Sequence, residues 1–134
     1  MMVHFPSALL PVDFVFNLIA AFSGFRALND AAYYCLAAGV LGGWVAMGAG
    51  LIDLIRFIKP GSPAIRKVII HFCIQATVII CFSIVLALEY KHPGMRETPS
   101  SLMLVCKGGF LVAMLFGNFI GGEIVLKYVA KEFQ

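Results

Sequence analysis

Residues 39–53 read GVLGGWVAMGAGLID, and the small residues of this stretch follow a helical repeat. They are spaced by four, three, four and three positions: Gly39, Gly43, Ala46, Gly50 and Asp53. Residues at these separations lie on one face of an α-helix. Such a face lets a neighbouring helix or a flat ligand approach the backbone closely, and it ends in one carboxylate. The stretch therefore predicts a central helix against which other segments pack.

The composition places the chain among membrane proteins. Hydrophobic residues make up 61% of its 134 positions and charged residues only 13%, which is far more apolar than an ordinary soluble domain. Four apolar segments reach the ~20 residues that a helix needs to cross a bilayer. They are residues 6–25, 31–58, 65–88 and 102–126. We expect an all-α protein, an integral membrane antiparallel four-helix bundle that forms one domain over residues 1–134.

Charge gives the expected orientation and partners. Basic residues flank the second connection and follow the last helix: Arg56, Lys59, Arg66, Lys67, Lys127 and Lys131. The opposite side has Arg26, Lys91 and Arg96. Because basic residues collect in the cytoplasm, we expect both termini there, with the first helix retained. The net charge of +3 is too small to indicate nucleic acid, and the lipid bilayer is the expected partner.

The connections predict how the helices follow one another. Asp30 is placed to cap the second helix. Residues 60–63 read PGSP, a tight turn that makes the second and third helices antiparallel neighbours. Residues 91–100 form a polar loop with two prolines, the longest connection of the chain.

One polar side chain with ligating chemistry is expected near the cytoplasmic end of each helix: His4, Asp53, His71 and Glu123. Ionisable residues inside a membrane are costly, so they indicate a functional site by default, and helix bundles build metal and cofactor sites in this way. Each residue also has a structural alternative, in which the histidines rest in the interface or pack, and the acids pair with nearby basic residues. The small-residue faces on the second and fourth helices are typical of plain helix packing.

Four segments together resemble a known family. Residues 3–11 (VHFPSALLP), 50–53 (GLID), His71 and 121–125 (GGEIV) are similar to the bacterial membrane family catalogued as domain of unknown function 2231. The resemblance implies a four-helix protein of the bacterial inner membrane. Members often occur fused to, or beside, c-type cytochrome or Rieske-type domains, which implies redox work by association. This chain has no CxxCH motif, so a cofactor would be held without thioether attachment.

A b-type haem explains this set of residues, with the chain acting in electron transfer. His4 and His71 would supply the axial pair, although His71 lies deeper by its position in the sequence. Asp53 and Glu123 would orient a histidine N–H. The remaining candidates are glycines that leave room for the ring and basic residues that meet the propionates: Gly43, Gly50, Gly117, Gly121, Arg56, Arg66 and Lys67.

Two further interpretations stay open. The same histidines and carboxylates suit a bare iron, manganese or zinc ion, in a membrane enzyme or a transporter. Alternatively, the chain is a structural or assembly subunit of a larger membrane complex, with redox partner proteins or a second copy as its neighbours. We do not expect it to be an enzyme on its own, because no nucleophile and base set or phosphate loop is present in the sequence.

The other polar residues inside the spans have ordinary explanations. Asp13, Gln75 and Asn118 lie nearer the middle of their helices, where hydrogen bonds between helices are expected, and a proton path or a quinone headgroup is the alternative. Lys107 is expected to extend its ammonium group to the far interface. His92 is expected to be solvated in the outer loop.

Overall fold

The computed structural model describes the backbone of residues 4–57, 65–124 and 126, and the side chains of these residues except positions 4, 5, 56 and 57. Its helices are α1 (His4–Ser23), α2 (Ala27–Phe57), α3 (Ile65–Lys91), α4 (Pro93–Glu97) and α5 (Ser101–Ile124). Within these residues, four helices are long and apolar enough to cross a membrane, namely α1, α2, α3 and α5. The predicted all-α class is confirmed.

A glycine ends α1. Gly24 has a φ of 71°, in the left-handed region that glycine tolerates without a Cβ clash. Its N–H donates to the carbonyl of Ala20 at 2.9 Å, as expected for the residue that closes a helix. The chain can therefore reverse within three residues and enter α2.

The predicted cap of the second helix was wrong. α2 begins at Ala27, so Asp30 lies inside its first turn and does not precede the helix. The Asp30 carboxylate instead binds the guanidinium of Arg96 at 3.0 Å. The polar connection also differs from the expected loop, because α4 occupies its middle. Pro93 stands in the first turn of α4, where its missing N–H costs nothing.

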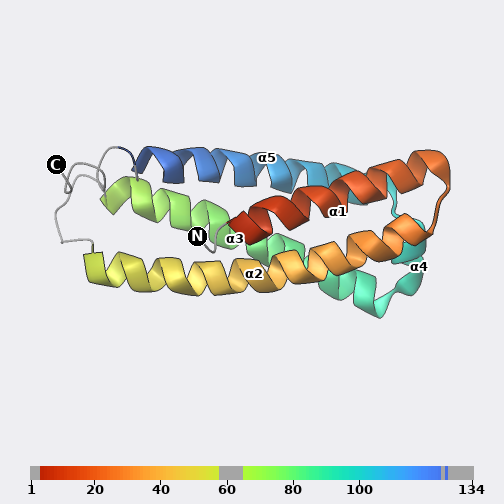
Figure 1. Ribbon diagram of the computed structural model, residues 1–134, viewed down its shortest axis with the longest axis horizontal. Coiled ribbons are helices and arrows are strands. Elements are labelled where there is room, and N and C mark those ends of the chain that lie inside the picture. The colour runs from red at the N-terminus through yellow and green to blue at the C-terminus, as the bar shows by residue number, and fades with distance from the viewer. Residues whose placement is uncertain (1–3, 58–64, 125, 127–134) are drawn as a thin grey trace.

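The long helices form an antiparallel ring (Figure 1). α1 lies against α2 and α5, and α3 lies against the same two helices. The predicted contact between the second and third helices is thus confirmed. α4 closes one end of the ring, where it contacts α2 and α3. We refer to this as the α4 end.

The helices differ in length, and this shapes the bundle. At a rise of about 1.5 Å per residue, the 20 residues of α1 span about 30 Å and the 31 residues of α2 about 46 Å. Both helices meet at the α4 end, so α1 begins part-way along the bundle (Figure 1). Beyond that point α2, α3 and α5 continue without α1 between them.

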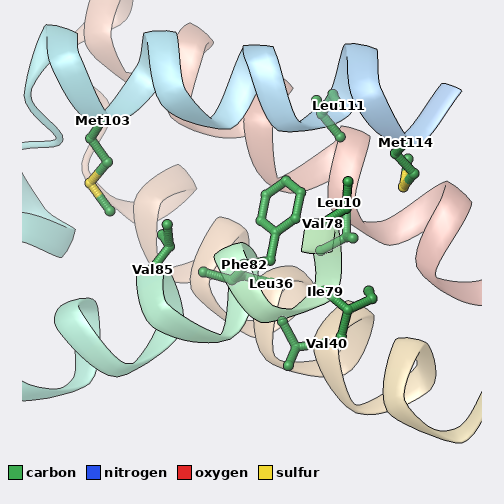
Figure 2. Close-up of a cluster of buried hydrophobic side chains, with 10 residues drawn as sticks. All are labelled: Leu10, Leu36, Val40, Val78, Ile79, Phe82, Val85, Met103, Leu111 and Met114. Atoms are coloured by element: carbon green, nitrogen blue, oxygen red, sulfur yellow. The ribbon is translucent and has the colours of Figure 1, made fainter. Parts of the chain in front are cut away.

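The core lies between the long helices on the α4 side of the start of α1. Its buried side chains are Leu10, Leu36, Val40, Val78, Ile79, Phe82, Val85, Met103, Leu111 and Met114. Figure 2 shows the ring of Phe82 in the middle of this cluster. Phe82 is fully buried and meets Phe110 edge-on, with the ring centroids 5.6 Å apart. Because the outward surface is also apolar, close packing holds the helices together in a bilayer.

Phe82→Ala is expected to destabilise the bundle by about 3–5 kcal/mol, the range for truncating a buried phenylalanine, because it leaves a cavity between the helices. Unfolding in detergent micelles, followed by circular dichroism, measures this change. Phe119→Ala is the matched control, since Phe119 is 73% exposed, and it should leave the unfolding free energy nearly unchanged. Equal losses in the two variants would contradict the assigned core.

Candidate functional site

A cavity lies where α1 begins. Its volume is about 130 Å³, and its wall comes from all four long helices. The lining residues are Pro6, Ser7, Gly43, Ala46, Met47, Gly50, Leu54, Val68, His71, Phe72, Gln75, Ile79, Met114 and Asn118. The cavity follows from the lengths of the helices, because α2, α3 and α5 run on past the first turn of α1. We call it the histidine cavity, since His71 is the titratable residue among the described side chains that line it.

His71 has a fixed orientation in this wall. The imidazole is half-buried, and its Nδ1 lies 2.7 Å from the carbonyl oxygen of Gly117 on α5. A carbonyl oxygen only accepts hydrogen bonds, so Nδ1 carries a proton. In the neutral imidazole, the lone pair is then on Nε2, which makes no hydrogen bond with any side chain or backbone group that the structure describes. This is the arrangement of a histidine whose Nε2 is available as a ligand.

A chain of amide and hydroxyl contacts sets the height of α1 in the bundle. Gln75 of α3 donates to Asn118 Oδ1 of α5 at 2.7 Å, and Asn118 Nδ2 donates to Ser7 Oγ of α1 at 3.1 Å. Gln75 is one turn from His71, and Ser7 is one turn from His4, where α1 begins. The backbone of the first turn of α1 therefore lies near the turn of α3 that carries His71. The interhelical hydrogen bonds expected for Gln75 and Asn118 are confirmed.

The small-residue face of α2 meets several different neighbours along its length. A Cβ on Gly39 would lie 2.8 Å from Cδ2 of Leu10 on α1, and one on Gly43 would collide with the side chain of Ile79 on α3. A Cβ on Gly50 would meet nothing within 4 Å, and Gly50 borders the histidine cavity. Only the last part of the face therefore opens onto space that a ligand can use.

The glycines of α5 admit side chains of α3. A Cβ on Gly117 would lie 2.9 Å from Nε2 of Gln75, and one on Gly121 would lie 2.8 Å from Cε1 of His71. These two glycines therefore let α3 and α5 approach closely and leave room for the imidazole next to the α5 backbone. The space that the sequence suggested for a ring is occupied there by His71 and Gln75.

The charged candidates lie apart from His71. Glu123 binds Lys67 across α3 and α5 at 2.7 Å, so each satisfies the other. Asp53 and Arg66 are exposed. The imidazole is oriented by the Gly117 carbonyl, the task expected of Asp53 or Glu123. The side chains of His4 and Arg56 lie outside the described residues.

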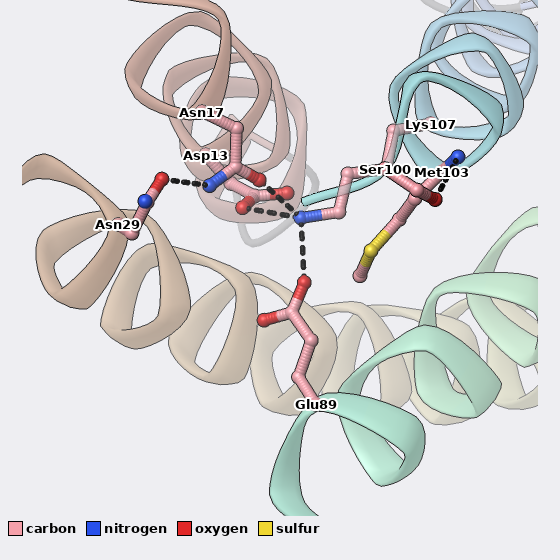
Figure 3. A network of polar contacts seen from close by, with 7 residues as sticks. All are labelled: Asp13, Asn17, Asn29, Glu89, Ser100, Met103 and Lys107. Atoms are coloured by element: carbon pink, nitrogen blue, oxygen red, sulfur yellow. Dashed lines mark hydrogen bonds and ion pairs between the residues drawn. The ribbon is translucent and has the colours of Figure 1, made fainter. Parts of the chain in front are cut away.

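A second polar site lies in the half of the bundle nearer the α4 end, and it corrects the expectation for Lys107. The Lys107 side chain is fully buried and does not reach the interface. Its ammonium group binds Asp13 Oδ1 at 2.8 Å, Asn17 Oδ1 at 2.6 Å and Glu89 Oε1 at 2.9 Å (Figure 3). These partners lie on α1 and α3. We call Lys107, Asp13 and Glu89 the buried charge cluster.

The cluster continues into α2 and α4 through two asparagines. Asn17 Nδ2 donates to Asn29 Oδ1 at 3.2 Å (Figure 3). Asn29 Nδ2 in turn donates to the backbone carbonyl of Glu97 at 2.9 Å. Asn17 and Asn29 are both nearly fully buried. Every helix of the described bundle thus takes part in one polar network.

The comparison with known families agrees with this architecture. The sequence profile of predicted membrane proteins designated DUF2231, a domain of unknown function, matches residues 1–132. The chain belongs to the DUF2231 family. No curated protein and no solved structure gives a match to it. The description of the family and the four long apolar helices thus agree on a membrane protein.

Sequence reasoning on this DUF2231 chain missed the buried charge cluster. The available signal was that Asp13 and Asn17 are four residues apart and share one face of α1, while Lys107 is a cation in another apolar segment. A charge that is buried in a bundle needs an opposite charge. An interfacial Lys107 would need no such partner, and the sequence analysis expected one at the interface. Lys107 nevertheless lies six residues inside α5.

The described residues offer no ready-made metal cluster. No three side chains of histidine, cysteine, aspartate or glutamate among them lie close enough to hold a metal ion. Within this part of the chain, His71 is the candidate ligand with a nitrogen free and a cavity beside it.

Lys107→Met is expected to destabilise the DUF2231 chain by about 3–5 kcal/mol, because it leaves two carboxyl groups in the apolar interior without their cation. Arg26→Met is the control, since the Arg26–Glu97 pair is 3.9 Å long and exposed, and its loss should cost about 0–1 kcal/mol. Detergent unfolding measures both. A Lys107→Met protein as stable as Arg26→Met would contradict the described network.

Proposed function

We propose that this DUF2231 chain binds a b-type haem in the membrane and transfers electrons, with His71 as an axial ligand. The observation that carries the proposal is the orientation of His71. Its Nδ1–H is held by the Gly117 carbonyl, and its Nε2 is left without a described partner in the wall of a cavity. Ligating histidines are typically held in this way through their second nitrogen.

The walls of the histidine cavity partly fit such a group. They are mainly apolar, and Gly50 leaves open space next to them, as the edge of a flat ring requires. The enclosed volume of about 130 Å³ is below the ~300–1,000 Å³ of common small-molecule sites. A haem at His71 would therefore also extend through the open side of the cavity. Gly43, Gly117 and Gly121 would support the surrounding helices, because side chains of α3 already fill their space.

His4 is the proposed second axial ligand. Its side chain lies outside the described residues, but α1 begins at His4 and its first turn is tied to α5 by the Ser7–Asn118 hydrogen bond. This axial position of the start of α1 supports His4 and His71 as a pair of ligands. If α1 began at the far end of the bundle, the two histidines would be separated. Exposed Arg66, together with Arg56, would meet the propionates. Lys67 would do so only after leaving Glu123.

A bound haem would supply one-electron transfer at a potential set by its ligands and surroundings. The residues of this chain would do the remaining work. Gly117 fixes the imidazole plane, while Met47, Leu54 and Phe72 exclude water from the ring. The proposed partners are redox proteins or a second copy of the chain at the membrane surface.

A bare iron, manganese or zinc ion has less support, because Asp53 is exposed and Glu123 is engaged with Lys67. The alternative is a structural role, in which the chain is an assembly subunit of a larger membrane complex. It requires no cofactor, and the first experiment below separates it from the haem.

His71→Ala is expected to abolish the Soret band and the α and β bands of the reduced protein, because it removes an axial ligand. The measurement is an optical spectrum of the full chain purified in detergent from haem-replete cells. His92→Ala is the matched control, since His92 is exposed at the α4 end, and it should keep the spectrum. His4→Ala should behave like His71→Ala.

A colourless wild-type protein would refute the haem. Stoichiometric metal by elemental analysis would then favour the bare ion, and defined co-purifying membrane subunits without metal would favour the assembly role. A haem spectrum that survives His71→Ala would overturn the assignment of this ligand.

Gly50→Leu is expected to reduce the haem content several-fold while both histidines are kept, because the new side chain fills the histidine cavity. Gly48→Leu is the control, since Gly48 lies two residues away on the same helix, is exposed and does not border the cavity. The haem-to-protein ratio measures occupancy. Equal haem content in the two variants would place the binding site elsewhere.

A further inference from the structure

The buried charge cluster has an uneven number of charges. Lys107 and Asp13 have fully buried side chains, and that of Glu89 is only 3% exposed. Lys107 contributes one positive charge, while two ionised carboxylates would contribute two negative charges. Moving a net charge from water into the interior of a membrane bundle costs on the order of several kcal/mol or more. The cluster therefore needs one further positive charge.

The hydrogen bonds show where that charge is missing. The ammonium group of Lys107 donates hydrogen bonds to Asp13 Oδ1 and Asn17 Oδ1 and forms an ion pair with Glu89 Oε1. The amide group of Asn17 donates away from the cluster to Asn29. The hydrogen bond of Lys107 to Asp13 thus goes to Oδ1, and Lys107 makes none to the second oxygen, Oδ2.

Asp13 Oδ2 is the oxygen without a partner. It is buried, and no group among the described residues donates a hydrogen bond to it. An ionised carboxylate oxygen without a donor is strongly disfavoured in an apolar interior, whereas a proton on that oxygen removes its charge. The charge count calls for a proton on one of the two carboxyl groups, and the unpartnered oxygen independently selects Asp13.

We propose that the buried charge cluster is a proton-binding site, and that one proton resides on Asp13 Oδ2 at neutral pH. With this proton the cluster is neutral, since the ammonium of Lys107 balances the carboxylate of Glu89. Loss of the proton leaves one net negative charge among α1, α3 and α5. The site is separate from the histidine cavity and does not depend on haem binding.

The other titratable groups that the structure describes near the cluster lie on α2, on α4 and in the turn before α2. On α2, the thiol of Cys35 is within electrostatic range of Asp13. Asp30 of α2 binds Arg96 of α4. Glu97 of α4 binds Arg26, which lies in the turn before α2. These two ion pairs each balance within themselves, so they do not supply the missing charge.

Infrared difference spectroscopy of the full chain in lipid nanodiscs tests the proposal. Wild type at neutral pH should show the carbonyl stretch of a protonated carboxylic acid, and labelling aspartate with ¹³C at the carboxyl carbon should shift that band. Asp13→Asn removes the acid, and Glu89→Gln leaves one carboxylate against one ammonium. Both variants should lose the band. Asp30→Asn, the matched change of an exposed carboxyl group, should keep it.

Stability gives a second readout that does not rely on the band. Raising the pH above neutral should destabilise wild type, because loss of the proton leaves an uncompensated negative charge. Asp13→Asn and Glu89→Gln should resist this change, since each is neutral without an extra proton. A loss shared by all three proteins would report deprotonation of Lys107 and would count against the proposal.

Other outcomes would overturn it directly. A wild-type protein without the band at neutral pH holds no such proton. If its stability then rises with sodium chloride but not with choline chloride, a metal cation balances the cluster. A band that shifts with labelled glutamate and not with labelled aspartate would move the proton to Glu89 and refute the assignment to Asp13.

Discussion

Lys107 connects the helices of the bundle. It binds α1 through Asp13 and Asn17 and α3 through Glu89, and the asparagine pair carries the network to α2 and α4. In a bilayer, lipid tails are as apolar as the helix surfaces, so apolar contact alone does little to select one arrangement of four helices. A buried cation is different, because it is satisfied only where its partners converge. This constraint selects the ring order and the axial position of the helices near the α4 end.

The other half of the bundle is organised by packing and helix length. Gly39 and Gly43 admit Leu10 and Ile79, so α2 can approach both of its long neighbours. α1 then begins part-way along the bundle, and the remaining helices border a cavity beside His71. Hydrogen bonds through Asn118 join α1, α3 and α5 beside this cavity. The bundle therefore has one half that the buried charge cluster holds together and another half that contains a cavity.

The two halves suit different chemistry. The histidine cavity offers a nitrogen lone pair in an apolar wall, which suits the iron of a flat cofactor. The buried charge cluster offers a carboxyl oxygen without a described partner, on a carboxyl group whose other oxygen binds Lys107, and this suits a proton. Ionisable groups inside membranes commonly serve such roles because leaving them uncompensated is so costly.

The sequence by itself determined the class of protein and the helices. Apolar segments of sufficient length predict spans wherever they occur, and the prolines and glycines between them separate the helices with errors of a few residues. The four-residue repeats of small side chains correctly indicated close helix packing. His71 was identifiable as well, since a histidine two turns inside an apolar span needs a partner.

Only the tertiary structure decided which polar groups meet. The sequence placed the four candidate ligands toward one end of the bundle, with His71 deeper than His4, by assuming that every helix starts at the same membrane surface. In the structure, α1 begins part-way along the bundle. The sequence also predicted that the Lys107 ammonium group reaches the membrane interface. In the structure, this group binds residues distant in the chain, such as Asp13, 94 positions away. Helical periodicity assigns a residue to a face of its own helix, while the axial offset and rotation between helices come from packing and charge pairing of the whole bundle.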